Sequence, residues 1–274
     1  MHDDECIYDL YPLHTRLVLQ ASGPNRLTES LRSTTLEVVI EKYLSGHGYG
    51  YDSEKRSVVL LVRVVKPEQS GLPAFVAKVF DPNMNQNPMD PLTYPQGATQ
   101  FCEAGREAEI AVYQRLESFQ GTTIPLFYDD FRVHKQWDQY QTSMYPVSAI
   151  LLGVIDLPSL ADRDPDDYSP SERQAMETAV YALLDKFHEL GVYHLDDNPP
   201  NWFWDRQQNT LKVIDFEDAI CADNTSTYVR DTASPVWTAE DRGNMETMLN
   251  SSCGVPYKIP PDPSDFRIPV RSLG

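Results

Sequence analysis

Cysteine is scarce in this chain of 274 residues, which contains only four. No two of them form a C-x-x-C pair or a Cys/His spacing typical of metal sites, so neither a disulfide framework nor a zinc site is expected, and reduced thiols in the cytoplasm or nucleus are the better expectation. Long apolar runs are also missing. The longest, 58–65 and 149–157, are too short to span a bilayer and are typical of strands. The chain does not start with a basic region followed by an apolar segment, so no signal peptide and no membrane partner are expected.

Basic residues are also few, relative to acidic ones. The chain has 23 Lys and Arg against 41 Asp and Glu, a formal net charge of −18. This balance argues against nucleic acid or an anionic membrane surface as the main partner, although a local basic pocket remains compatible with it. Hydrophobic residues make up 41% and aromatic residues 11%, so the chain is globular and long enough to bury a core in one domain or two lobes.

The first half of the chain is typical of an antiparallel sheet with one helix. We expect residues 1–34 to be an irregular arm. Apolar and β-branched residues then indicate strands, and successive turns between them indicate hairpins. The expected strands are 36–40, 57–65, 74–80, 124–133 and 146–157. A proline-rich loop is expected over 81–99, followed by a helix over 101–116.

The second half contains a helix with clear boundaries. Ser169 and Glu172 form a capping-box pattern around Pro170, and apolar residues follow at helical spacing. Gly191 comes where a left-handed residue ends such a helix. We further expect a hairpin from 202–204 and 211–214 with Trp202 and Trp204 in its core, a helix over 239–250, and an extended proline-rich tail.

One stretch after this helix carries the chemistry. It reads His194-Leu-Asp196-Asp-Asn-Pro-Pro-Asn201, and Asp215-Phe216 follows a short apolar strand. Phosphoryl transfer from a metal-bound nucleotide uses one carboxylate to orient the acceptor hydroxyl, and an asparagine and a second carboxylate to hold Mg²⁺. The sequence therefore indicates a kinase reaction.

From residue 36 to residue 219 the chain resembles the protein-kinase-like superfamily, in particular its compact, divergent fungal members, and is similar to aminoglycoside and choline phosphotransferases. The resemblance implies an α+β, two-lobe fold with a nucleotide-binding N-terminal antiparallel sheet, one main helix and a shortened, mostly helical C-terminal lobe. The implied domains are the arm 1–34, an N-lobe at 35–152 and a C-lobe at 153–274.

The same resemblance assigns roles to the residues of the motif. Asp196 is the implied catalytic carboxylate, with the adjacent Asp197 as an alternative if the register slips by one residue. Asn201 and Asp215 are the implied Mg²⁺ ligands. His194 is expected to anchor the backbone of the loop. Without the resemblance, Asp196 would be read as part of an acidic surface loop.

Lys78 lies in a Val-Ala-Lys-Val segment that resembles the strand whose lysine contacts the ATP phosphates. An acid on the following helix should pair with this lysine, because an unpaired buried cation is costly to desolvate. Glu109 is the preferred partner, Glu107 the alternative and Glu103 a weaker one. Solvated helix acids remain the plainer interpretation.

Three glycines between the first two expected strands occupy the place of the family's phosphate-covering loop, where backbone amides approach the phosphates. They are Gly46, Gly48 and Gly50. A plain hairpin turn is the alternative interpretation.

The pattern departs from protein kinases in three places. Asn198 stands where a lysine or arginine is usual, Glu217 replaces the glycine of D-F-G, and no A-P-E segment follows. We expect an ATP- and Mg²⁺-dependent phosphotransferase, with protein Ser/Thr hydroxyls slightly favoured over small molecules as acceptor. The alternative is a pseudokinase that binds a nucleotide or a protein and transfers nothing. The short region after Asp215 indicates a rudimentary acceptor site, a small acceptor or a shortened gene product.

Overall fold

The computed structural model describes residues 11–22, 33–44, 57–67, 72–82, 94–135, 146–196 and 198–221. The fold is α+β, as expected. The chain forms two compact units: Met1–Tyr113 with Pro125–Ile155, and Gln114–Ile124 with Asp156–Gly274. Each unit is described below by itself.

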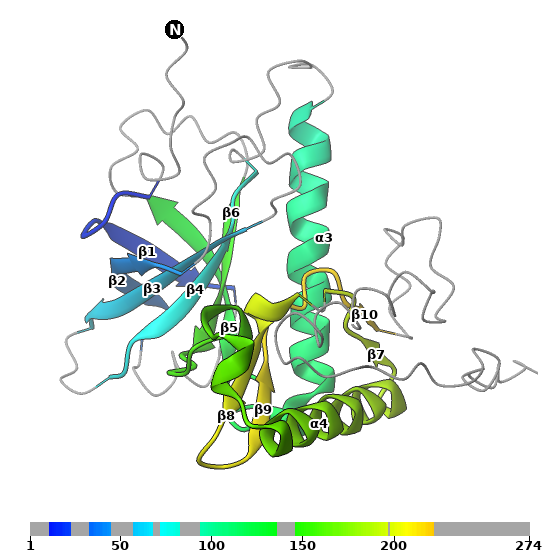
Figure 1. Ribbon diagram of the computed structural model, residues 1–274. Coiled ribbons are helices and arrows are strands. Elements are labelled where there is room, and N and C mark those ends of the chain that lie inside the picture. Colours follow the sequence, from blue (N-terminus) through cyan, green and yellow to red (C-terminus); the bar gives the residue numbers. More distant parts are fainter. Residues whose placement is uncertain are drawn as a thin grey trace, which may run out of the picture. The chain divides into compact units, whose positions relative to one another are not determined.

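The first unit is built on a closed barrel of antiparallel strands (Figure 1). The strands follow one another around the barrel in the order β1-β2-β3-β4-β6-β5, and β1 pairs with β5 to close it, with Leu19 opposite Val133. Their bounds are Arg16–Ala21 (β1), Thr35–Tyr43 (β2), Val58–Lys66 (β3), Phe75–Phe80 (β4), Phe127–Lys135 (β5) and Val147–Gly153 (β6).

Alternate residues of these strands fill the barrel, because successive side chains of a strand point to opposite faces. Leu17 and Leu19 on β1 are fully buried in this core with residues of all the other strands. The expectation that 1–34 is an irregular arm is therefore wrong for 16–21. The alternation there covers only a few residues, and the pairing of β1 with the distant β5 has no local signal in the sequence.

Helix α3, Tyr94–Arg115, runs beside β5 and β6 in Figure 1. Its side chains contact β4, β5 and β6 through Lys78, Asp130 and Ser148. The helix starts seven residues before the expected position 101, so the loop expected over 81–99 is wrong at its end. Pro95 did not prevent this, since a proline is tolerated in the first turn of a helix.

The second unit contains α4, Pro170–Glu189. The expected capping box is present: the Ser169 side chain accepts a hydrogen bond from the Glu172 backbone N–H, and the Ser169 N–H donates to Glu172 Oε2 at 2.9 Å. Gly191 follows the helix with φ 72°, the left-handed conformation that its position predicted.

Two small antiparallel pairs complete this unit. The expected hairpin is formed by β8, Trp202–Asp205, and β9, Thr210–Val213, with Trp202 and Trp204 buried. A second pair, β7 with β10, was not predicted. The bounds of the remaining elements are Val192–Tyr193 (β7), Ile220–Cys221 (β10), Glu117–Phe119 (η2), Leu160–Asp162 (η3), Pro165–Asp167 (η4) and Pro199–Asn201 (η5). The helix expected over 239–250 and the proline-rich tail lie outside the described residues.

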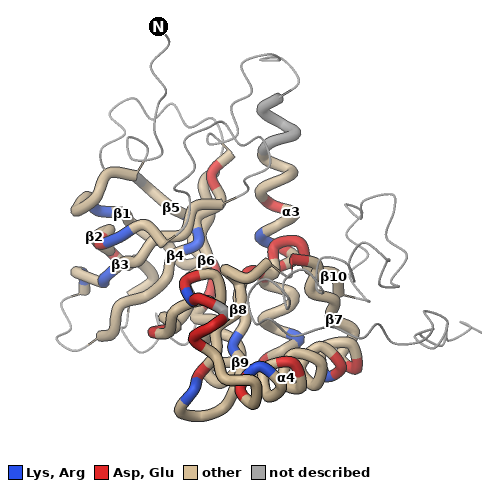
Figure 2. Tube along the Cα trace, viewed as in Figure 1, with Lys and Arg blue, Asp and Glu red and all other residues tan. Residues whose placement is uncertain are grey.

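Acidic residues gather along the segment from Asp156 to Glu172, in which Arg163 is the one basic residue. Figure 2 shows the acidic residues before α4 in red. A predominantly acidic surface repels anionic ligands, so this segment is unfavourable for polyanions. In the described part of the chain, no helix has the length and apolar character needed to cross a membrane.

Candidate functional site

The motif loop of the second unit begins at β7 and ends in η5, which leads into β8. Its base is fixed by His194, which is buried and whose Nε2 lies 3.0 Å from the carbonyl oxygen of Ile214. Pairing of β7 with β10 brings the two ends of this region together, with Tyr193 opposite Ile220. The expectation that His194 anchors backbone is confirmed.

Asp196 is half-buried, and both of its carboxylate oxygens accept hydrogen bonds from side-chain amides. Asn201 Nδ2 donates to Oδ2 at 2.9 Å, and Asn198 Nδ2 donates to Oδ1. Hydrogen bonds to an ionised acceptor are stronger than those between neutral groups, so the two amides fix the orientation of the carboxylate. Sequence reasoning treated Asn198 only as a departure from the family pattern, and did not foresee this contact.

Asn201 also connects the loop to the segment that contains Asp215. The N–H of Ile214 donates to the carbonyl oxygen of Asn201 at 3.0 Å, so Asp215 is one residue from a direct backbone contact with Asn201. Asp215 has φ 67°, in the left-handed region that aspartate adopts more readily than most residues. Strained backbone of this kind gathers at functional sites, where the surrounding structure holds it in place.

A cluster of aromatic rings packs against the motif loop and against the segment that contains Asp215. The ring of the fully buried Phe216 lies 5.1 Å from that of His194 and 6.2 Å from that of Phe187 on α4. Trp202 lies 5.6 Å from His194. The two contacts of Phe216 are edge-to-face, and such contacts at these separations add to the stabilisation from burial. Phe216, the residue after Asp215, therefore joins the motif loop to α4 through its ring contacts.

His188, on α4, stacks on Tyr193 with ring centroids 4.9 Å apart. Burial lowers the pKa of His188, against an opposing effect of the nearby Asp185 carboxylate, and burial raises the pKa of Tyr193. Both shifts favour the neutral form of the group. This pair accordingly packs α4 against β7, where the motif loop begins.

The first unit holds the other part of the motif set. Lys78 Nζ on β4 lies 2.7 Å from Glu109 Oε2 on α3, and the two side chains are only 3% and 1% exposed. The structure thus pairs Lys78 with the preferred candidate, Glu109. Glu107 is exposed, and Glu103 forms an ion pair with Arg106.

Gly46, Gly48 and Gly50 lie outside the described residues, as does Asp197. Their assignments stay predictions.

Comparison with known protein families finds a similarity for the part of the chain that contains Glu109 and the motif loop. The model of the lipopolysaccharide kinase (Kdo/WaaP) family matches residues 98–227, a little under half of the chain. The chain is similar to a kinase family. The matched region includes Glu109, Asp196, Asn201 and Asp215, and it supports phosphotransferase activity. A search of curated proteins finds no match. Nothing in these comparisons points specifically to the fungal proteins.

Proposed function

We propose that this protein is an ATP- and Mg²⁺-dependent phosphotransferase with the two-lobe organisation of protein kinases. Asp196 would orient the acceptor hydroxyl and take its proton, and Lys78, held by Glu109, would bind phosphate oxygens of ATP. The observation that carries the proposal is the connection of the three motif residues of the second unit. Asn201 donates to the Asp196 carboxylate and accepts from the backbone beside Asp215.

The donor set in the second unit suits Mg²⁺. Because Nδ2 of Asn201 donates to Asp196, its Oδ1 is the end of the amide that can ligate a cation. The half-buried carboxylate of Asp215 supplies a second hard oxygen ligand, which is the ligand type that Mg²⁺ prefers. When bound, the ion would neutralise charge that develops on the transferred phosphoryl group.

We further propose a sugar hydroxyl as acceptor, in place of the protein Ser/Thr hydroxyl that the sequence slightly favoured. Two observations support this revision. The matching family is described as a lipopolysaccharide kinase family. Position 198, which protein kinases fill with a cation, holds an asparagine that is bonded to Asp196 instead.

Transfer of labelled phosphate from ATP to a panel of mono- and oligosaccharides, with a basic protein as comparison, tests the proposal. We expect labelled sugar from the wild type and none from Asp196→Asn, because the loss of a properly placed base costs about 10²–10⁴-fold in rate. Asp185→Asn, an exposed change on α4, is the matched control and should keep full activity. Labelling of the protein alone would contradict the sugar assignment, and unchanged turnover in Asp196→Asn would contradict the catalytic one.

A nucleotide-binding module without transfer is the second candidate. Two features favour this candidate. The side-chain amide of Asn198 donates to Asp196 Oδ1, an oxygen that a catalytic base would offer to the acceptor, and Glu217 follows Asp215-Phe216 in place of the usual glycine. This candidate predicts ATP binding with no labelled product from any acceptor, and Asn198→Lys would not restore transfer.

A further inference from the structure

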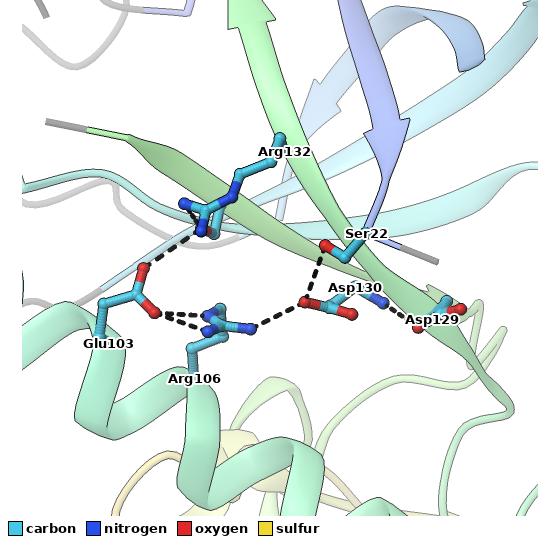
Figure 3. Close-up of polar contacts among 7 residues, drawn as sticks. Ser22, Glu103, Arg106, Asp129, Asp130 and Arg132 are labelled. Carbon is cyan, nitrogen blue, oxygen red and sulfur yellow. Dashed lines mark hydrogen bonds and ion pairs between the residues drawn. The ribbon is translucent and has the colours of Figure 1, made fainter. Parts of the chain in front are cut away.

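The contacts of α3 reveal a second attachment of this helix to the barrel. Arg106, only 13% exposed, donates from Nη1 to Asp130 Oδ2 on β5 at 2.9 Å. The same guanidinium contacts Glu103 on its own helix, at 3.1 Å from Nε and 2.6 Å from Nη2 (Figure 3). An arginine with two such partners is held in one orientation, because its donors form a rigid planar fork.

The partners of Arg106 are themselves fixed to the strands. Ser22, the residue that follows β1, donates to Asp130 Oδ2 at 3.2 Å, and the backbone N–H of Asp130 donates to Asp129 Oδ1 at 2.7 Å. Ser148 on β6 donates to Glu103 Oε1 at 3.3 Å. Figure 3 shows this network between the helix and the strands. Arg106 is therefore anchored to rigid elements and not to a loop.

The register of the sheet relates this attachment to the buried pair of Lys78 and Glu109. Ile150 on β6 lies opposite Asp130 on β5 and also opposite Lys78 on β4. Asp130 and Lys78 thus occupy one row across the sheet and point to the same face, about 9–10 Å apart, or two strand spacings. Helix α3 is bound to both ends of this row by Arg106 and Glu109, which are three residues apart and are neighbours on the helix surface.

Two attachments in one row fix the rotation of the helix about its axis. Side-chain ends lie about 5–6 Å from the axis of a helix, so a rotation of about 20° would move the Glu109 carboxylate by about 2 Å. A shift of that size breaks a contact of 2.7 Å. Arg106 prevents this rotation through Asp130.

We propose that Arg106 is a positioning residue for nucleotide binding, acting through Glu109 on Lys78. This inference rests on the proposed function for the ATP role of Lys78, while the positioning of Glu109 rests on geometry alone. The guanidinium itself would contact no substrate.

The test measures ATP affinity by calorimetry for Arg106→Gln, Arg106→Lys and Asp130→Asn. Loss of one charge-assisted hydrogen bond corresponds to about a tenfold change in equilibrium constant, so we expect the dissociation constant of ATP to rise about tenfold in Arg106→Gln and Asp130→Asn. Arg106→Lys should give a smaller rise, since an ammonium replaces the fork. Arg63→Gln, which removes an ion pair with Glu41 on the barrel surface, is the matched control and should leave affinity unchanged.

Addition of Glu109→Gln separates positioning from general destabilisation. If Arg106 acts through Glu109, the Arg106→Gln change adds little to the affinity loss of Glu109→Gln, because coupled sites are not additive. The inference would be overturned if the increases in the ATP dissociation constant caused by the two changes multiplied in the double variant. It would also be overturned if Arg106→Gln lowered the melting temperature without changing ATP affinity.

Acylation of Lys78 by a soluble acylating reagent, followed by mass spectrometry, provides a readout that needs no ATP. Lys78 should be protected in the wild type and in Arg63→Gln, and should react severalfold faster in Arg106→Gln. Absence of ATP binding in the wild type would refute the proposed function. The rate of Lys78 labelling would still test whether Arg106 holds Glu109 beside Lys78. Equal labelling in all variants would overturn that positioning.

Discussion

Removal of Glu109 should be among the most destabilising single changes in the first unit. The pair with Lys78 is 3% and 1% exposed, so Glu109→Ala removes a carboxylate that is paired with an ammonium group in the interior. Breaking a buried pair in this way costs about 3–5 kcal/mol. For a chain of this size, that corresponds to a fall in melting temperature of roughly 6–20 °C.

The double change Lys78→Met with Glu109→Leu provides the informative comparison. It removes both charges and keeps apolar volume, and such replacements of buried pairs are often neutral or stabilising by about 1–4 kcal/mol. We therefore expect the double variant to be at least as stable as the wild type while losing ATP affinity. This combination would show that the pair is retained for function and not for stability.

Urea denaturation followed by fluorescence measures the free energies of unfolding for both variants. The control is Glu41→Ala, whose partner Arg63 is 60% exposed, and which should cost at most about 1 kcal/mol. A loss below about 1 kcal/mol in Glu109→Ala would refute the reasoning, since it would mean that the Lys78 ammonium finds water or another partner without cost.

Three further predictions concern the second unit. Arg206→Ala should lower the melting temperature, because its guanidinium pairs with Glu172 at 2.8 Å and covers the Tyr168 ring at 4.8 Å, and Arg206→Lys should restore little. The backbone N–H of Ser169 lowers the pKa of Glu172 from 4.5, so the Glu172 carboxylate stabilises the fold above pH 4.5, and this stabilisation is lost as the pH falls through the folded-state pKa. Melting temperatures measured over this pH range should show the loss in the wild type and not in Glu172→Gln. Burial lowers the pKa of His188 from 6.5, so stability should decline as the pH falls below about 6.5, and less so in His188→Gln.

Elements with strong local signals were predictable from the sequence. The capping box at Ser169, the left-handed Gly191 and the tryptophan hairpin each follow from residue types at fixed spacings, and all three are present. Strands β2, β3 and β4 likewise follow from runs of β-branched and apolar residues.

Features that depend on distant pairing were not predictable. Strand β1 needed β5 to close the barrel, and the pair of Arg106 with Asp130 depends on a register that joins residues far apart in the sequence. The order of Asp196, Asn201 and Asp215 indicated the motif, but not that Asn198 would also bond to Asp196. No periodic pattern encodes such contacts, because they arise only when separate segments meet.

The measurement that tests the central claim most directly is calorimetric titration of ATP into the wild type and Asp215→Ala, each with and without Mg²⁺, with Asp185→Ala as the control for loss of an acid. A magnesium-dependent phosphotransferase site predicts that Mg²⁺ strengthens ATP binding to the wild type and to Asp185→Ala, and that Asp215→Ala loses this gain. Absence of ATP binding in the wild type with Mg²⁺, or a full Mg²⁺ gain in Asp215→Ala, would contradict the account.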